Sequence, residues 1–349
     1  MNKRASNIEL LRIIAMMLVL LLHANFLSLG GVEKITSVES FSRFMAGQLC
    51  IICVNVFILI SGWFGINPHL KGAFSLLFQV FFYAISVTLP FVLMGDHIEL
   101  GNLIDLFYFG SFYWFVPAYL VLYGFSPVLN AFVKQSSVRQ YFFVLLTFFI
   151  FEFSLGWIRG EIATYNFGYS TISFIGLYLL GRFLNLHFHS IKQFSTMKYI
   201  LLYLLFTIIP VLWFLFTGDE RNMFAYSSPF VVFASMFFFL AFTKLKFENK
   251  YVNYLACSSF SIYLIHMHPS IWPYYKNIIA ATYENLNGLV FILFIILFVF
   301  VFSVSCMLLD KLRIQLWNYL CKTFIDKWIF GIENLAERFC DKMAFNKKE

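Results

Sequence analysis

Long apolar runs dominate this sequence of 349 residues and leave few ways for it to fold. Hydrophobic residues make up 61% of the chain, charged residues only 12%, and phenylalanine alone occurs 48 times. The core of a water-soluble domain cannot bury so much apolar surface. A hydrocarbon layer about 30 Å thick instead accommodates helices of about 20 apolar residues. We therefore expect an all-α, polytopic integral membrane protein.

Polar residues divide the apolar sequence into ten segments, each of which we expect to form a transmembrane helix. The first segment carries Arg12 and shows no convincing cleavage site, so we expect a retained helix rather than a signal peptide. The ten segments lie near Ile8–Leu29, Gln48–Phe64, Gly72–Met94, Ser111–Val133, Tyr141–Ile158, Gly168–Gly181, Tyr199–Thr217, Ala225–Thr243, Val252–Trp272 and Leu289–Leu309.

The distribution of Lys and Arg predicts the orientation, because positively charged loops are retained in the cytoplasm. With the N-terminus inside, 19 of the 25 basic residues fall in inner segments and five in outer loops. We therefore expect both termini in the cytoplasm, and the basic composition reflects topology rather than nucleic-acid binding. Residues 1–312 are expected to form the membrane domain. Residues 313–349 mix charged and aromatic residues, which is typical of an amphipathic tail along the inner interface, and no appended soluble catalytic domain is expected.

The pair Cys50 and Cys53 has a spacing found in metal and redox sites. It lacks a second pair of cysteines, and it falls in or beside a predicted span. Packing of small apolar side chains is the favoured interpretation, and we expect no metal.

Ionisable residues within the apolar segments are rare, and their cost at bilayer depth makes them candidates for function. Arg12 and His23 are 11 residues apart in the first segment, which is about three helical turns plus 20°, so they share one face. A guanidinium binds phosphate or carboxylate with two hydrogen bonds. An imidazole serves as a general base or proton relay near neutral pH. The pair is therefore expected to hold opposite ends of one elongated ligand entering from the cytoplasm.

A purely structural interpretation of these two residues also exists. Arg12 can extend to the inner interface and pair with Glu9, three residues earlier, without any further role. A single histidine in a membrane helix can simply bond to a neighbouring helix. The shared face of Arg12 and His23 favours the functional interpretation.

Five segments, in order, resemble the signature of membrane acyltransferase family 3. The first runs from Asn7 to His23 and matches the Arg and His of the family's first helix. The others are Val54–Trp63, Tyr113–Val116, Ser173–Arg182 and Ser259–His266, the last resembling the family's Ser-Tyr-x-x-Tyr-Leu-x-His. The likeness extends to about Leu309 and includes the expected number of ten helices.

The resemblance implies a membrane O-acyltransferase that moves an acyl group, in the first place acetyl, from cytoplasmic acyl-CoA to a carbohydrate hydroxyl. Acetyl-CoA is then the acyl donor and a cell-surface or lipid-linked polysaccharide the acceptor. The protein would lie in the cytoplasmic membrane of a bacterium. His23 is expected to deprotonate the acceptor or relay the acyl group.

Other residues are expected around this pair. His266 lies at a depth similar to that of His23, so with Ser261 and Tyr263 it is expected to orient the base or contact the thioester carbonyl; ordinary bonding between helices is the alternative. Lys71 is expected to help Arg12 hold the phosphates of CoA.

Four further residues remain open between binding and structure. Ser61 and Gly62 either approach the pantetheine arm or pack helices closely. Trp114 either stacks on a sugar or belongs to the aromatic belt of the outer interface. Glu152 either contacts the acceptor or pairs with Arg159.

A transporter or flippase for a glycan or lipid-linked sugar is the competing function. Buried charge in a ten-helix protein also suits translocation, and paired broken helices would favour it. The sequence shows no convincing inverted repeat.

Overall fold

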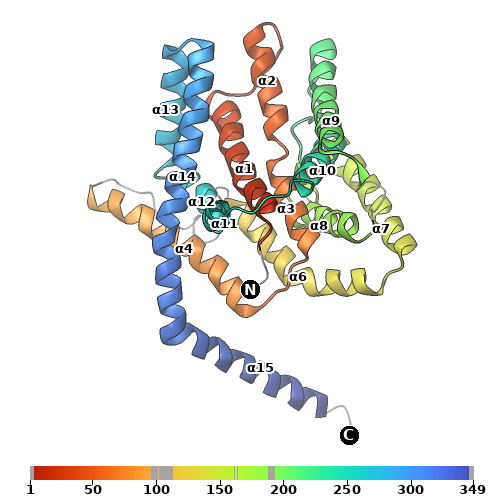
Figure 1. The fold of residues 1–349 in the computed structure, drawn as a ribbon, viewed down its shortest axis with the longest axis vertical. Coiled ribbons are helices and arrows are strands. Elements are labelled where there is room, and N and C mark those ends of the chain that lie inside the picture. The colour runs from red at the N-terminus through yellow and green to blue at the C-terminus, as the bar shows by residue number, and fades with distance from the viewer. Residues whose placement is uncertain are drawn as a thin grey trace.

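A computed structural model describes residues 4–95, 101, 113–160, 162, 164–187 and 193–345. The regular elements in these ranges are all helices, which confirms the all-α prediction (Figure 1). Ser111, the predicted start of the fourth span, lies outside the described residues. The principal helices are α1 Ser6–His23, α2 Val38–Cys50, α3 Cys53–Phe64, α4 Leu70–Leu93, α6 Phe115–Gln135, α7 Val138–Phe151, α8 Thr171–Leu186, α9 Thr196–Thr217, α10 Pro229–Thr243, α11 Lys250–Ala256, α12 Phe260–His266, α13 Trp272–Asn285, α14 Gly288–Leu320 and α15 Asp326–Phe345.

Seven helical stretches of the described chain are long and apolar enough to cross a membrane. Two shorter apolar helices, α8 and α10, coincide with the sixth and eighth predicted spans. These helices indicate a multi-pass membrane protein, whereas the total of ten spans and the cytoplasmic position of both termini stay predictions. The seven stretches are Ser6–Ser28, Val38–Phe64, Leu70–Leu93, Phe115–Gln135, Val138–Ile158, Thr196–Thr217 and Gly288–Phe339.

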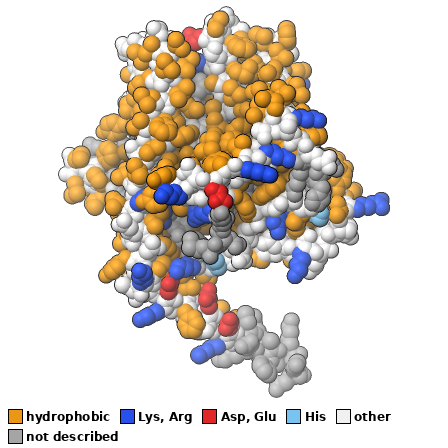
Figure 2. All heavy atoms as spheres, in the orientation of Figure 1, with side chains coloured by type: hydrophobic (Ala, Val, Ile, Leu, Met, Phe, Trp, Pro, Cys, Tyr) orange, Lys and Arg blue, Asp and Glu red, His pale blue; other side chains and the backbone are white. Residues whose placement is uncertain are grey.

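The molecular surface agrees with immersion in lipid. Along α14, the side chains of Leu289, Leu293, Leu297 and Phe300 are all exposed. Figure 2 shows hydrophobic side chains covering the upper part of the visible face, while Lys and Arg gather in its lower half. Exposed leucine and phenylalanine in such numbers would aggregate in water but are well solvated by acyl chains.

The ninth predicted span, Val252–Trp272, is not one continuous helix, which corrects the expectation from hydropathy. Helix α11 ends at Ala256, the chain turns through Cys257–Ser259, and α12 then ends at His266. Ser261 Oγ donates to the carbonyl oxygens of Ser258, at 2.7 Å, and of Cys306 in α14, at 3.0 Å. A helix can break inside a membrane only where such partners satisfy its backbone, and serine supplies them here.

Helices α3 and α8 cross at very close range through glycine. A Cβ atom on Gly62 would lie 2.1 Å from the carbonyl oxygen of Tyr178, and one on Gly181 would lie 2.5 Å from that of Leu59. Small residues allow membrane helices to approach in this way. Of the two interpretations of Gly62, close helix packing is therefore the one that its surroundings explain.

The tenth span continues past its predicted end at Leu309. Helix α14 has 33 residues, or about 50 Å, so the predicted domain boundary at residue 312 falls inside it. Helix α15 then projects away from the bundle (Figure 1). Its large apolar side chains are exposed and, with Phe324, follow a spacing of four, seven and four residues along one face: Phe324, Trp328, Leu335 and Phe339. This is the pattern of an interfacial helix, as expected for the tail.

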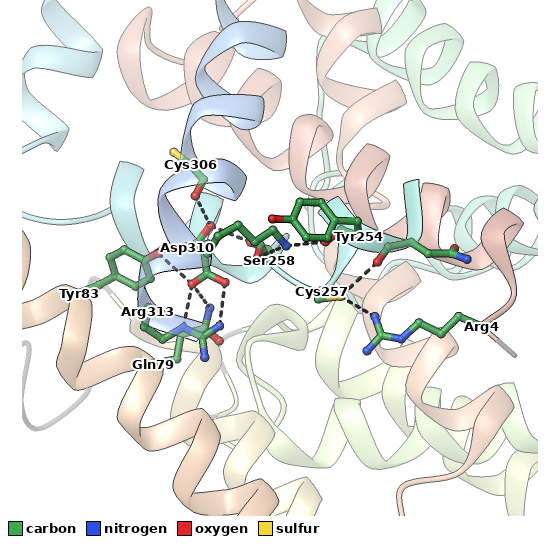
Figure 3. A network of polar contacts seen from close by, with 12 residues as sticks. Arg4, Gln79, Tyr83, Tyr254, Cys257, Ser258, Cys306, Asp310 and Arg313 are labelled. Carbon is green, nitrogen blue, oxygen red and sulfur yellow. Dashed lines mark hydrogen bonds and ion pairs between the residues drawn. The ribbon is translucent and has the colours of Figure 1, made fainter. Parts of the chain in front are cut away.

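A buried ion pair connects α14 to α4. Both Arg313 nitrogens Nε and Nη2 donate to the carboxylate of Asp310, at 2.9 and 2.7 Å, and neither residue is more than 5% exposed. Tyr83 and Gln79 of α4 donate to the same carboxylate at 2.9 and 3.3 Å. Figure 3 shows these three donors converging on Asp310, beside the turn that carries Cys257 and Ser258. The network holds α14, and hence the broken segment bonded to it, against α4.

We expect replacement of Asp310 by Ala to destabilise the protein strongly, because Arg313 would remain buried without its partner. Breaking a buried pair in this way costs about 3–5 kcal/mol. The measurement is the midpoint of thermal unfolding in detergent. A double variant, Asp310→Leu with Arg313→Met, leaves no unpaired charge and should recover most of the loss. An Asp310→Ala protein as stable as the wild type would show that the network has no such role.

Candidate active site

Helix α1 is continuous from Ser6 to His23 and carries Arg12 and His23 about 16 Å apart along its axis. The α1 residues that line two neighbouring cavities are spaced by four, three and four positions: Arg12, Met16, Val19 and His23. That spacing defines one face of a helix, as predicted for the outer two. The side chain of Arg12 opens on the first cavity and that of His23 on the second.

The cavity at Arg12 has a volume of about 300 Å³, at the lower end of the range for small-molecule sites. Its wall combines two guanidinium groups with several hydroxyl and amide groups and with apolar side chains. Within the described chain, the Arg12 guanidinium makes one ion pair, at 3.6 Å from Glu9, and no hydrogen bond. The lining residues are Arg4, Arg12, Phe57, Ile60, Ser61, Leu76, Gln79, Phe115, Val116, Tyr119, Ala256, Cys257, Ser259 and Phe260.

The cavity at His23 is much smaller, about 30 Å³, and mostly aromatic. It shares three phenylalanines with the larger cavity, so the two are adjacent. Trp114 lies in its wall, with its ring stacked on that of Tyr226 at a centroid distance of 6.0 Å and tilted against Tyr169 at 4.6 Å. The lining residues are Met16, Val19, His23, Val54, Phe57, Trp114, Phe115, Tyr226, Phe260 and Tyr263.

His23 and His266 form a directly bonded pair, with 2.9 Å between His23 Nδ1 and His266 Nε2. His266 Nδ1 lies 2.8 Å from the carbonyl oxygen of Ile262, which can only accept, so this nitrogen carries a proton. A charged imidazole would be costly in these apolar surroundings, so the neutral His266 accepts at Nε2. His23 must then donate from Nδ1, which leaves the lone pair of His23 Nε2 available to accept a proton.

The surroundings of His23 fix its ring. The ring of Trp272 contacts it edge-on at a centroid distance of 6.0 Å. Directly after His23 the chain forms the π-helical segment η1, Ala24–Ser28, and Tyr275 donates to the carbonyl oxygen of Leu20 at 2.8 Å. Single π-helical turns often occur at functional sites. The base is thus oriented by α12 on one side and by α13 on the other.

The remaining predicted residues separate into those at the cavities and those elsewhere. Ser61 lines the Arg12 cavity, where its hydroxyl lies 3.3 Å from that of Tyr119, and Tyr263 lines the His23 cavity. Ser261 is directed at α14 through its bond to Cys306, so it positions α12 rather than facing a cavity. The predicted grouping of Ser261, Tyr263 and His266 is therefore one helix with different faces.

Lys71 and Glu152 lie away from both cavities. The Lys71 ammonium group is 2.7 Å from the carboxylate of Asp326 in α15, so it ties the tail helix to the start of α4. Glu152 is buried at the start of the π-helical segment η3, Glu152–Ile158, and no ion pair joins it to Arg159. Its Oε2 has no hydrogen-bond partner among the described residues. The structure does not bring either residue to Arg12.

Sequence reasoning missed two groups of residues at this site. Asp310 and Arg313 follow the predicted end of the tenth span, so they were assigned to the tail although they are buried. The phenylalanines shared by the cavities cannot be recognised among 48. For Asp310, its spacing of three residues from Arg313 in an apolar context was the signal that could have identified the pair.

Comparison with known families decides the class of protein. The model of the acyltransferase domain of acyltransferase family 3 matches residues 6–309. The chain belongs to acyltransferase family 3. No curated protein and no solved structure is significantly similar to it. In an acyltransferase, a histidine with a free Nε2 beside a cavity is placed as a base for the attacking group.

We expect His266→Ala to lower kcat for acyl transfer about tenfold, the worth of one hydrogen bond that aligns His23. KM for the acyl donor should not change, because His266 lines neither cavity. His266→Gln keeps an amide oxygen to accept from His23 and should restore part of kcat.

The matched control is His268→Ala. His268 is also buried and bonds to Thr88 at 3.2 Å, but it lines neither cavity. A His266→Ala protein with unchanged kcat, or one in which only KM rises, would contradict the proposed alignment.

Proposed function

We propose that the protein transfers an acetyl group from acetyl-CoA to a hydroxyl group of a cell-surface or lipid-linked polysaccharide across the cytoplasmic membrane of a bacterium. The observation that carries this proposal is the single face of α1 that joins the Arg12 cavity to the His23 cavity. Membership of acyltransferase family 3 supports an acyltransferase in general. The donor, the acyl group and the acceptor are the proposed part.

The donor enters the Arg12 cavity from the cytoplasm. Two guanidinium groups, those of Arg4 and Arg12, are suited to the phosphates of CoA, because each can form paired, charge-assisted hydrogen bonds. The apolar and hydroxyl groups of the wall, such as Ser61 and Tyr119, suit the pantetheine arm. Both termini in the cytoplasm, as the charge distribution favours, would place this cavity on the donor side.

The chemical step uses His23 as a general base. Nε2 of His23 takes the proton of the acceptor hydroxyl as its oxygen attacks the thioester carbonyl, forming the C–O bond. The C–S bond then breaks, and the proton passes from His23 to the CoA thiolate. No further reactant is needed. The aromatic wall of Trp114 and Tyr226 supports a sugar acceptor, because sugar rings expose C–H groups that pack on aromatic faces.

The first test uses inside-out membrane vesicles that contain the cell's own acceptors, supplied with acetyl-CoA radiolabelled in the acetyl group. We expect label in the glycan fraction with the wild-type chain, and a loss of about 10²–10⁴-fold in rate for His23→Ala. His187→Gln is the control, because His187 contacts the rings of Phe183 and Tyr141 instead of the cavities. Equal labelling by wild type and His23→Ala would rule out His23 as the base.

A second test addresses the donor end. Arg12→Ala should raise KM for acetyl-CoA about tenfold or more, since charge-assisted hydrogen bonds to phosphate contribute about 1.5–3 kcal/mol. Arg12→Lys keeps the charge without the planar fork and should restore only part of the affinity. Titration of the vesicles with acetyl-CoA measures both. An unchanged KM in Arg12→Ala would place the phosphates elsewhere.

The break between α11 and α12 is the one observation that favours a transporter or flippase, because broken helices line translocation sites. Here its turn lines the Arg12 cavity through Ala256, Cys257 and Ser259. Deletion of the chain separates the two functions. Loss of an O-acetyl signal from the surface glycan supports transfer, whereas unchanged acetylation with accumulated lipid-linked sugar supports transport.

A further inference from the structure

The two cavities meet at three phenylalanines that line both of them: Phe57 of α3, Phe115 of α6 and Phe260 of α12. We call these residues the phenylalanine collar. Because they come from three different helices, they surround the connection instead of covering one side of it. Each of the three is only partly buried, as expected for rings that border open space.

Ring contacts fix the collar in place. The rings of Phe115 and Phe260 lie 6.1 Å apart. Phe115 also stacks on Tyr119, a wall residue of the Arg12 cavity, at 5.6 Å, and Phe260 stacks on Tyr263, a wall residue of the His23 cavity, at 5.7 Å. Aromatic pairs at these distances attract one another. The collar is therefore continuous with the aromatic walls on both sides.

We propose that the phenylalanine collar selects the acyl group by its size, so that acetyl reaches His23 and longer acyl groups do not. This inference rests on the proposed function. The thioester carbonyl must come within about 3–3.5 Å of the attacking oxygen, which itself bonds to His23. The acyl group must therefore pass from the large cavity between the collar rings.

The sizes of the two cavities support this selection. The space at His23 is about 30 Å³, against about 300 Å³ at Arg12. One water molecule requires at least about 10–15 Å³ of such space, so the smaller cavity accommodates only a group of a few heavy atoms. Each added methylene must then displace a collar ring. One methylene more or less in a tight apolar pocket changes specificity by roughly 10- to 200-fold.

The experiment compares acetyl-, butyryl- and hexanoyl-CoA, each radiolabelled in the acyl group, in the same inside-out vesicles. We expect the wild type to transfer acetyl at least tenfold faster than butyryl, and hexanoyl slower still. Phe57→Ala and Phe260→Ala should each raise the ratio of butyryl to acetyl transfer at least tenfold. Phe57→Leu is a milder variant, which keeps a branched apolar side chain should the alanine protein fold poorly, and should shift the ratio less.

Phe300→Ala is the matched control, because it removes the same atoms from a side chain that is 55% exposed on α14. It should leave the ratio unchanged. A wild type that transfers hexanoyl as fast as acetyl would overturn the collar and leave the proposed function standing, as would collar variants with unchanged ratios. No transfer by the wild type from any of the three donors would overturn the proposed function itself.

Discussion

The hydrogen bond between His23 and His266 is the interaction on which the site depends, because it determines which nitrogen of His23 is free. It holds only if α12 presents His266 Nε2 at the right depth and angle. The carbonyl oxygen of Ile262 fixes the tautomer of His266, and Ser261 fixes α12 to α14. Asp310 and Arg313 then hold α14 to α4. A proton position in the centre of the bundle is thus supported by polar contacts that line neither cavity.

The break in the ninth segment explains how such a site can form in a membrane. A straight helix would bury its carbonyl groups in its own hydrogen bonds and leave no turn beside the Arg12 cavity. The turn through Cys257–Ser259 places polar backbone and side-chain groups there, and Lys311 stabilises it by donating to Ser258 Oγ at 2.9 Å. Irregular backbone at this depth is tolerated only where protein or a cavity satisfies it. The serines that look like weak points in a hydropathy profile are what makes the break stable.

The parts of this structure that could be predicted are those set by local periodicity. The spacing of Arg12 and His23 gave their common face, and apolar run lengths gave the helical class. Contacts between helices could not be predicted in this way. Hydropathy cannot separate one helix over Val252–Trp272 from two short helices, because both bury the same residues. It also ended the tenth span before Asp310, since a charge is buried there only by virtue of Tyr83 and Gln79 from a distant helix. Lys71 and Glu152, chosen for their charge alone, lie away from the cavities.

A protein that moves an acyl group across a bilayer must connect the two sides for the substrate and not for water. The Arg12 cavity is wide and charged, and the His23 cavity is narrow and aromatic, so the proposed path changes character over about 16 Å of α1. Polar groups at the narrow part would hold water, which could attack the thioester in place of the acceptor. The phenylalanine collar has no hydrogen-bonding side-chain atoms, so water gains nothing by resting there. The same apolar constriction that limits the size of the acyl group therefore also favours transfer over hydrolysis.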